Sequence, residues 1–299
     1  AVIVDNSSGN NPTITLAVGS DNRTAVYASG DNSTALVFRY TIQAGDNDDN
    51  GTSIRANALA LNSSTISDPA GNIPDNLTHD AVPDNSSVKV DTTAPSVDNF
   101  TMSDTELKIG DNATVTLVFS EAVIEFSSAA DITADNGTLS TMNSSDNITW
   151  IGYFTPTDDV EDDTNTLSLG TSYTNIAGNS GPDNQTANYE IDTREPTVSS
   201  VAITSATGRQ NDFVNATDNV SVTATFSEVV IVDNASGTPT LTIVVGSNNR
   251  TATYVSGTGS DDLVFQYTIQ SGDNDTNGIS IPANALALNS GTIRDAAGN

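Results

Sequence analysis

Residues 220–226 read VSVTATF, a strict alternation of apolar and polar side chains. Val220, Val222, Ala224 and Phe226 alternate with Ser and Thr. Successive side chains of a β-strand point to opposite faces, so this stretch predicts a strand with one face in a core and the other in water. The strand and its acidic end, VTATFSEVV at 222–230, also occur earlier in the chain as VTLVFSEAV at 115–123. The chain therefore repeats a β-strand together with the Ser-Glu pair that follows it.

A longer repeat links the two halves of the chain. Residues 31–72 match residues 258–299 without a gap, and DTTAPSV at 91–97 recurs as DTREPTV at 192–198. Repeats of this length are the signature of tandem modules. We therefore predict three modules of about 100 residues, at 1–91, 92–192 and 193–299. The first and third are close relatives, and the middle one is divergent.

The remaining segments are short and strand-like. Residues 13–18 (TITLAV), 36–42 (LVFRYTI) and 240–245 (TLTIVV) are rich in Val, Ile, Thr and aromatics, and Gly, Asn, Asp and Ser clusters bound them. Only ANALAL, at 56–61 and 283–288, leans toward helix, and it is too short to be stable alone. The fold class predicted is all-β, with tandem Ig-like β-sandwich modules.

The first and last modules differ in which parts they contain. Residues 1–91 lack the DTxxP-to-FSE start that the other two modules have, and residues 193–299 lack a counterpart of the tail at 72–90. We expect a first module without its N-terminal strands and a last module without its C-terminal strand. Such modules would be cut from a longer periodic chain.

Composition excludes several classes of partner. The chain of 299 residues has 9 Lys and Arg against 38 Asp and Glu, a formal charge of −29, and this surface repels nucleic acids and anionic lipids. No apolar run approaches the length of a membrane span, so we expect no membrane insertion. Without cysteine there are no disulfides or thiolate metal sites. Hydrophobic residues, at 36%, leave enough apolar material for a core in each module.

The motifs resemble a known family. DTTAP at a module start, FSEAV or FSEVV after a strand, the GDNDxxNG loop and a closing DAAGN are similar to the bacterial Ig-like domains repeated in giant surface adhesins and extracellular fibres. The resemblance covers nearly the whole chain. The middle module departs from it, because it has no DND loop and carries NIAGN at 175–179. The resemblance implies a calcium-rigidified extender or fibre module of the cell surface or the extracellular space, and not an enzyme.

The first candidate cation site is a loop that occurs twice. Oxygen side chains at alternate positions followed by Gly form the front half of a calcium loop, in which the oxygens converge on one ion and Gly permits a sharp turn. Neither copy has the Glu that a complete EF-hand loop needs, and a polar hairpin loop is the alternative. The predicted ligands are Asp46, Asp48 and Asn50, and in the second copy Asp273, Asp275 and Asn277.

The second candidate site is the set of acids at the module boundaries. Carboxylates beside a rigid Pro, at Pro95 and Pro196, could hold a structural Ca²⁺ between consecutive modules and fix their angle. Turn capping on a solvated surface is the alternative interpretation. The residues are Asp91 and Asp192 of the DTxxP motifs, Glu121 and Glu228 of the FSE motifs, and Asp68 and Asp295 of the DxAGN loops.

Asparagine sequons are frequent. The pattern N-x-S/T occurs at 18 of 33 Asn, and Asp precedes 14 of the 18. Asp-Asn pairs also favour turns, but a regular Ser or Thr two residues later predicts exposed N-linked glycans on a secreted protein. Asn50 is excepted as a loop ligand. The predicted acceptors are Asn6, Asn22, Asn32, Asn62, Asn76, Asn85, Asn99, Asn112, Asn136, Asn143, Asn147, Asn184, Asn215, Asn219, Asn234, Asn249 and Asn274.

Catalysis has little support in the sequence. His79 is the only histidine, and neither a GxSxG motif nor a Gly-rich phosphate loop occurs. We predict a structural protein, namely a calcium-stiffened, glycosylated segment of an extracellular filament or adhesin stalk whose partners are copies of itself. A module that binds surface glycans and an accessory region of a secreted hydrolase are the alternatives. Salt adaptation could also explain the charge, although 31 Asp against 7 Glu favours turns and cation loops.

Overall fold

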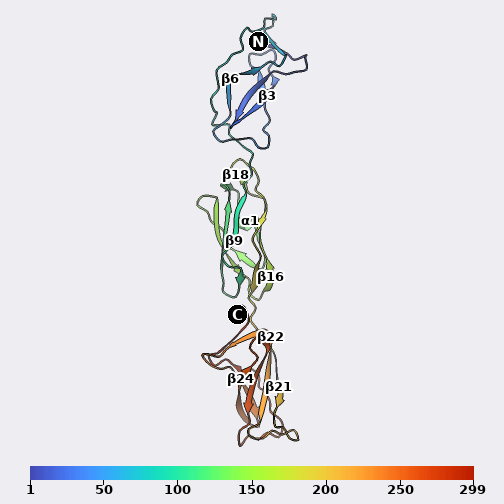
Figure 1. The fold of residues 1–299 in the computed structure, drawn as a ribbon, viewed down its shortest axis with the longest axis vertical. Helices are drawn as coiled ribbons and strands as arrows, with labels where there is room; N and C mark the ends of the chain where they lie inside the picture. Colours follow the sequence, from blue (N-terminus) through green and yellow to red (C-terminus); the bar gives the residue numbers. More distant parts are fainter.

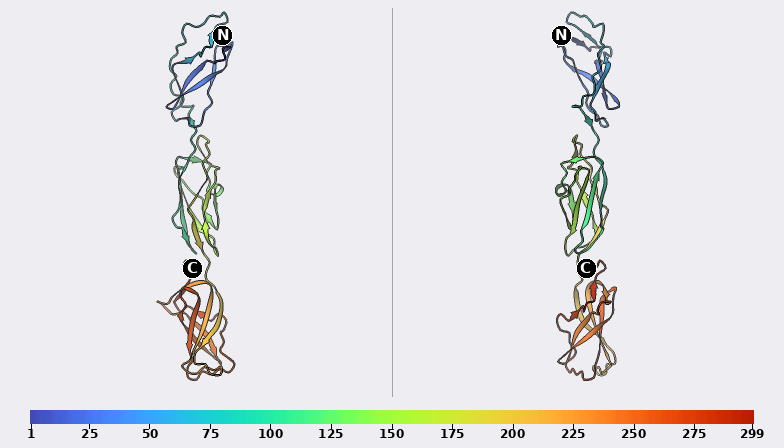
Figure 2. Two further views of the ribbon diagram at one scale, coloured as in Figure 1. Left: turned by 45° about the vertical axis from the view of Figure 1, so that its right-hand side comes forward. Right: turned by 90° about the vertical axis from the view of Figure 1, so that its left-hand side faces the viewer.

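The computed structural model describes residues 1–299 as three β modules placed end to end along one axis (Figure 1). Two further views show the same elongated arrangement (Figure 2). The expectation of an all-β chain is confirmed, since α1 (Ser128–Asp131) is the only helix. The N-terminus lies at one end of the molecule. The C-terminus lies beside the linker between the second and third modules, because the last residues run back to that linker (Figure 1).

The first module is built on one four-stranded antiparallel sheet in the order β4-β3-β2-β6. Two small pairs, β1 with β7 and β5 with β8, complete it. The first copy of ANALAL belongs to β6, where Leu59 pairs with Ile14, so sheet pairing overrides its helical preference. The strands are β1 (Ile3–Asp5), β2 (Thr13–Val18), β3 (Asp21–Ser29), β4 (Val37–Arg39), β5 (Asn47–Asp48), β6 (Ser53–Ala60), β7 (Thr65–Ser67) and β8 (Val90–Asp91).

The second module contains four small sheets around a core of 16 buried residues. The sheets have the orders β14-β15-β11-β9, β10-β20-β16, β13-β17-β19 and β12-β18. The strands are β9 (Val97–Met102), β10 (Glu106–Leu107), β11 (Ala113–Phe119), β12 (Val123–Ile124), β13 (Ile132–Ala134), β14 (Gly137–Leu139), β15 (Thr149–Pro156), β16 (Glu161–Asn165), β17 (Leu167–Leu169), β18 (Thr174–Asn175), β19 (Asn184–Gln185) and β20 (Tyr189–Asp192).

The third module has a continuous sheet in the order β21-β22-β25-β24-β23-β26, and β27 pairs with the end of β22. The alternation of residues 220–226 is confirmed, because Val220, Val222, Ala224 and Phe226 are all buried in a core of 14 residues. The strands are β21 (Val198–Ala206), β22 (Asn219–Asp233), β23 (Thr240–Val245), β24 (Asn248–Ser256), β25 (Ser260–Thr268), β26 (Leu286–Ala287) and β27 (Thr292–Arg294).

The first module does not bury a comparable core, which corrects the expectation of one core per module. In the third module β22 pairs with β25, and Leu263 and Phe265 are fully buried. Their counterparts Leu36 and Phe38 are only partly buried. The reason is that β4, the counterpart of part of β25, forms the edge of its sheet and no strand of residues 1–91 pairs with its outer side.

Candidate metal centre at the module boundaries

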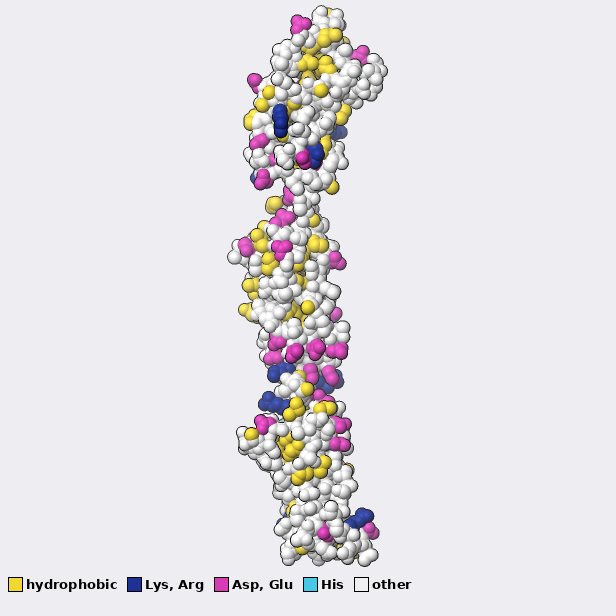
Figure 3. Space-filling view, viewed as in Figure 1, with side chains coloured by type: hydrophobic (Ala, Val, Ile, Leu, Met, Phe, Trp, Pro, Cys, Tyr) yellow, Lys and Arg dark blue, Asp and Glu magenta, His cyan; other side chains and the backbone are white.

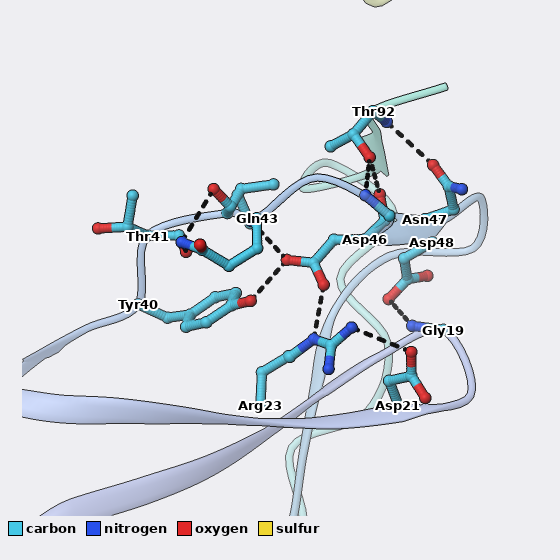
Figure 4. Close-up of polar contacts among 12 residues, drawn as sticks. Gly19, Asp21, Arg23, Tyr40, Thr41, Gln43, Asp46, Asn47, Asp48 and Thr92 are labelled. Atoms are coloured by element: carbon cyan, nitrogen blue, oxygen red, sulfur yellow. Dashed lines mark hydrogen bonds and ion pairs between the residues drawn. The ribbon is translucent and has the colours of Figure 1, made fainter. Parts of the chain in front are cut away.

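The first acid of the repeated loop is held by protein donors. The buried carboxylate of Asp46 accepts hydrogen bonds from the Gln43 backbone N–H at 2.8 Å and the Tyr40 hydroxyl at 2.6 Å, and it forms an ion pair with Arg23 at 2.6 Å (Figure 4). The Gln43 and Tyr40 hydrogen bonds, followed by Arg23, lower the pKa of Asp46. This carboxylate is therefore ionised and already neutralised.

The second copy of the loop repeats this arrangement. Asp273 forms an ion pair with Arg250 at 2.6 Å and accepts the Tyr267 hydroxyl at 2.6 Å and the Gln270 N–H at 2.9 Å. Burial alone would raise the pKa of Asp273, but the hydrogen bonds of Tyr267, Gln270 and Arg250 outweigh burial and lower it. The arginine precedes its aspartate by the same interval in both copies, and this recurrence is a sequence signal that the loop motif alone does not reveal.

The second acid of the loop binds backbone amides. Asp48 accepts the N–H groups of Gly19 and Gly51, both at 2.8 Å. Its counterpart Asp275 accepts those of Gly246, Gly278 and Asn277 at 2.8, 2.9 and 3.1 Å. The Gly246 amide contributes most to the lowered pKa of Asp275. These carboxylates brace the turn itself.

The geometry does not support the predicted calcium loop. Asp46 points to Arg23 and Asp48 points to the Gly19 amide (Figure 4). The Asn50 amide donates to Asp84 at 2.5 Å. Neither loop belongs to a group of three acidic side chains that could share an ion. The second copy of the loop, with Asp273, Asp275 and Asn277, lacks support for the same reason, because Asp273 pairs with Arg250 and Asp275 binds backbone amides.

The first copy of the loop holds the linker to the next module. β5 pairs with β8 at the module boundary. The Asn47 side chain accepts the Thr92 N–H at 2.9 Å (Figure 4). It also donates to the Thr93 hydroxyl at 2.9 Å, and the Thr92 hydroxyl accepts the Gly45 N–H at 2.9 Å. The loop therefore fixes the linker through hydrogen bonds to Thr92 and Thr93.

At the first boundary a buried amide joins the predicted acids. Asn175 is fully buried, and its Nδ2 donates to Asp91 at 2.8 Å, to the Thr93 carbonyl at 2.9 Å and to the two carboxylate oxygens of Glu121 at 3.3 and 3.4 Å. Its Oδ1 accepts the N–H groups of the NIAGN turn, including that of Asn179 at 3.0 Å. The structure thus brings Asp91 and Glu121 together, around a donor.

The second boundary has the same turn with a carboxylate in place of the amide. Asp295 takes the position of Asn175, and its Oδ1 accepts the N–H groups of Gly298 at 2.6 Å and Asn299 at 2.8 Å. One oxygen from each of Asp192, Glu228 and Asp295 lies within 4.8 Å of the other two, and no other group of three such ligands occurs in the chain. Figure 3 shows acidic side chains gathered between the second and third modules.

Electrostatic repulsion acts within this group of three acids. Burial first, and then the charges of Asp295, Asp192 and Glu161, raise the pKa of Glu228. Burial and the charges of Asp295 and Glu161 also raise the pKa of Asp192, against the effect of Arg194. Like charges held close together disfavour ionisation, and a cation among them reverses that effect.

Asp68 occupies the equivalent turn of the first module, but no pair of other acids lies close to it. Its Oδ1 accepts the N–H groups of Ala70 at 2.9 Å and Asn72 at 2.8 Å, and its Oδ2 accepts the Asn72 amide at 2.8 Å. Hydrogen bonds from Asn72 are the main cause of its lowered pKa. Asp68 is not part of a group of three acids, so the structure assigns it the turn and no shared site.

The predicted glycan acceptors lie almost entirely on the surface. All are exposed except Asn136 and Asn219, which are partly buried. The Nδ2 of Asn136 donates to Asp162 and to Asn165, both at 2.9 Å. Asn136 therefore combines partial burial with a reactive nitrogen that already makes two hydrogen bonds.

A comparison with known families concerns the middle of the chain. Residues 91–191 match the family model of the bacterial Ig-like domain. The matched span includes the whole first boundary site, from Asp91 through Glu121 to Asn175. Bacterial Ig-like domains are often parts of extracellular or surface proteins. No curated protein matches the chain, and none of its helices is long and apolar enough to cross a membrane.

Proposed function

We propose that this protein is a structural segment of an extracellular filament or adhesin stalk rather than an enzyme. In this proposal its modules act as spacers, and a calcium ion held by Asp192, Glu228 and Asp295 fixes the second boundary. The match of residues 91–191 to the bacterial Ig-like domain and the end-to-end arrangement of the modules support a spacer role.

One observation carries the calcium assignment, namely the exchange of Asn175 for Asp295 at equivalent boundaries. At the first boundary the Asn175 amide donates to Asp91 and Glu121, so the two carboxylates share a donor. At the second boundary the equivalent position carries an acceptor. The Asn299 amide donates to Asp295 at 2.9 Å and to Asp192 at 3.5 Å, but no side-chain donor reaches Glu228, the third acid of the group. A partly buried carboxylate without a donor is costly, and a cation shared with Asp192 and Asp295 would compensate the charge of Glu228.

The residues present fit calcium. Ca²⁺ takes six to eight oxygen ligands, largely from carboxylates and carbonyls. Asp192, Glu228 and Asp295 offer only oxygen, and no sulfur or imidazole ligand is near, since the chain has no Cys and His79 belongs to the first module. When bound, the ion would supply charge compensation. The protein's own part is to hold Asp295 in a turn braced by Gly298 and Asn299, with Asn299 donating to the Asp192 carbonyl at 2.7 Å.

Thermal unfolding of the full chain in calcium and in chelator tests this proposal. An ion that binds only the folded state at about 100 times its dissociation constant stabilises it by about 2.7 kcal/mol. We expect the transition of the third module to move upward by roughly 10 °C in calcium. An unchanged transition would exclude the calcium boundary.

The matched control is Asp295→Asn, which copies Asn175. We expect this variant to unfold in chelator at a higher temperature than the unchanged protein and to lose its response to calcium. A variant that still responds fully would place the ion elsewhere. Asp68→Asn is the negative control, because Asp68 has the same turn without the two other acids.

N-linked glycosylation is a second part of the proposal. The exposure of nearly all predicted acceptors supports it. Glycopeptide mapping of protein from its native source should find glycans at exposed sequons such as Asn76 and Asn234 and a bare Asn136. Bare asparagine at every exposed sequon would refute this part and leave the calcium boundary untouched.

A further inference from the structure

The residue that faces the boundary aspartate differs between the two boundaries. Asp91 and Asp192 occupy the same place, each as the last residue of its strand, β8 and β20. In the antiparallel pairing the residue opposite Asp91 is Asn47, whereas the residue opposite Asp192 is Glu161. Directly opposed residues of an antiparallel pair have their side chains on the same face of the sheet. The second boundary therefore has a fourth carboxylate, Glu161, beside its group of three acids.

The linker residue two positions after each aspartate pairs with this opposed residue. At the first boundary the Thr93 hydroxyl accepts a hydrogen bond from Asn47 Nδ2 at 2.9 Å. At the second boundary Arg194 takes the place of Thr93, and its Nη1 donates to Glu161 at 3.3 Å. Arg194 Nε also donates to Asp159 at 3.3 Å. A neutral pair at the first boundary is thus replaced by an ion pair at the second.

Arg194 holds Glu161 weakly. The side chains of Arg194, Glu161 and Asp159 are 48%, 60% and 85% exposed, and both contacts of 3.3 Å are longer than a typical hydrogen bond between charged groups. Exposed ion pairs contribute little stability, because water screens the charges. A divalent cation bound next to Asp192 therefore competes with Arg194 for Glu161 on favourable terms.

Both side chains are close enough to act on the group of three acids. Burial is the largest cause of the raised pKa of Asp192 and of Glu228, and the negative charge of Glu161 adds to it. The positive charge of Arg194 opposes the shift of both groups. Figure 3 shows basic side chains next to the acids between the second and third modules. Arg194 therefore supplies part of the charge compensation that a bound cation would supply.

We propose that Glu161 and Arg194 regulate the calcium site of the second boundary, an inference that rests on the proposed function. Without a divalent cation, Glu161 pairs with Arg194, which is the protein's own counter-charge. When calcium binds, Glu161 leaves Arg194 and becomes a fourth carboxylate ligand beside Asp192. Calcium takes six to eight oxygen ligands, so three carboxylates leave room for a fourth. Glu161 belongs to β16 of the second module and Asp295 to the third, so the ion then joins the two modules directly.

Calorimetric titration of the full chain with calcium at fixed ionic strength tests the role of Glu161. Glu161→Gln should weaken calcium binding by about tenfold or more, the scale on which metal sites respond to a lost partner. The matched variant Asp159→Asn removes the same charge from the same arginine but leaves the carboxylate beside Asp192. It should not weaken calcium binding. Equal affinities of the two variants would overturn the proposal.

Arg194→Thr, which copies Thr93, tests the competition. It should strengthen calcium binding by about fivefold or more, the usual size of a coupling between two binding events. The gain should be clearly smaller when Glu161 is already Gln, because no carboxylate is then released. Arg209→Thr is the control for lost positive charge, since Arg209 pairs with Asp212 at 3.9 Å within the third module. The same gain in this control, or an equal gain with and without Glu161, would contradict the competition.

Nuclear magnetic resonance of the Arg194 guanidinium follows the exchange directly. Its resonances should shift when calcium is added to the unchanged chain and should stay in place in Asp295→Asn, which lacks the ion site. No calcium binding by the unchanged chain would overturn the calcium boundary and this inference together. Calcium binding that leaves the Arg194 resonances in place would overturn this inference alone.

Discussion

At the first module boundary, a single atom of the Asn175 side chain provides the hydrogen-bond donor that two carboxylates share. Its Nδ2 donates to Asp91 and Glu121, and replacing that nitrogen with oxygen turns a donor into a third acceptor. We predict that Asn175→Asp destabilises the second module by about 2 kcal/mol in chelator, the scale of a lost hydrogen bond to charged groups. Calcium should restore most of the loss, because the variant then carries the same three acids as the second boundary. Calorimetry in calcium and in chelator measures both effects.

The reverse substitution at the second boundary, Asp295→Asn, provides a matched control for that test. Asp295→Asn removes the calcium response at the second boundary, and the double variant should move the response from the third module to the second. Destabilisation by Asn175→Asp that calcium leaves unchanged would show that three carboxylates at this position do not make an ion site.

Arg23 makes a different residue-level prediction. It is the only cationic partner of the buried Asp46, and removing it leaves that carboxylate uncompensated, although the exposure of about one-third of the Arg23 side chain moderates the loss. We predict that Arg23→Met lowers the denaturation midpoint of the first module. Arg39→Met, at an exposed arginine without an ion pair, is the control and should change it little. Denaturant titration checks both, and equal effects would contradict the pairing.

The linkers hold the modules through one repeated threonine. Thr92 accepts the Gly45 N–H and donates to the Asp46 carbonyl at 3.0 Å, while the buried Thr193 accepts the Val160 N–H at 3.0 Å and donates to the Thr157 carbonyl at 2.7 Å. Each hydroxyl ties the linker to the module before it. We predict that Thr193→Val costs about 1 to 3 kcal/mol, since it leaves the partly buried Val160 amide unpaired.

Loss of the tie should also loosen the junction. Residual dipolar couplings of the Thr193→Val chain should report wider motion between the second and third modules, with the first junction unchanged. Thr92→Val should produce the reverse pattern. A variant that alters both junctions equally would indicate general destabilisation rather than loss of a local tie.

Strands were predictable from the sequence and the loop chemistry was not. Alternation at 220–226 is a local property, and the burial of Val222 and Phe226 follows from it. The partner of Asp46 lies outside the loop, on the neighbouring strand β3, so spacing within the loop could not reveal Arg23. ANALAL was ambiguous for the same reason, because pairing with β2 decided its conformation. The boundary acids were identified from recurrence, but the contrast between Asn175 and Asp295 needed the fold.

At the scale of the whole molecule, the charge of −29 has a particular distribution. Arginines neutralise Asp46 and Asp273, and backbone amides bind Asp48 and Asp275. The acids of the second boundary, where two modules meet, repel one another instead. Repulsion at a junction affects the angle between modules, so the ionisation of a few groups there can change the shape of the entire chain.

Acid should therefore act in the same direction as calcium. Because burial and the neighbouring acids raise the pKa of Glu228 and Asp192, the folded protein keeps protons there that the unfolded chain has released. Stability at this boundary is present below the raised pKa values and decreases as the pH rises through them. In chelator, lowering the pH from neutral through the raised pKa values toward the ordinary carboxyl range should raise the melting temperature of the third module. The same change of pH should give a narrower distribution of the chain's overall length, measured by small-angle scattering. Asp295→Asn should remove most of both responses, and an unchanged response in that variant would place the titrating groups outside this boundary.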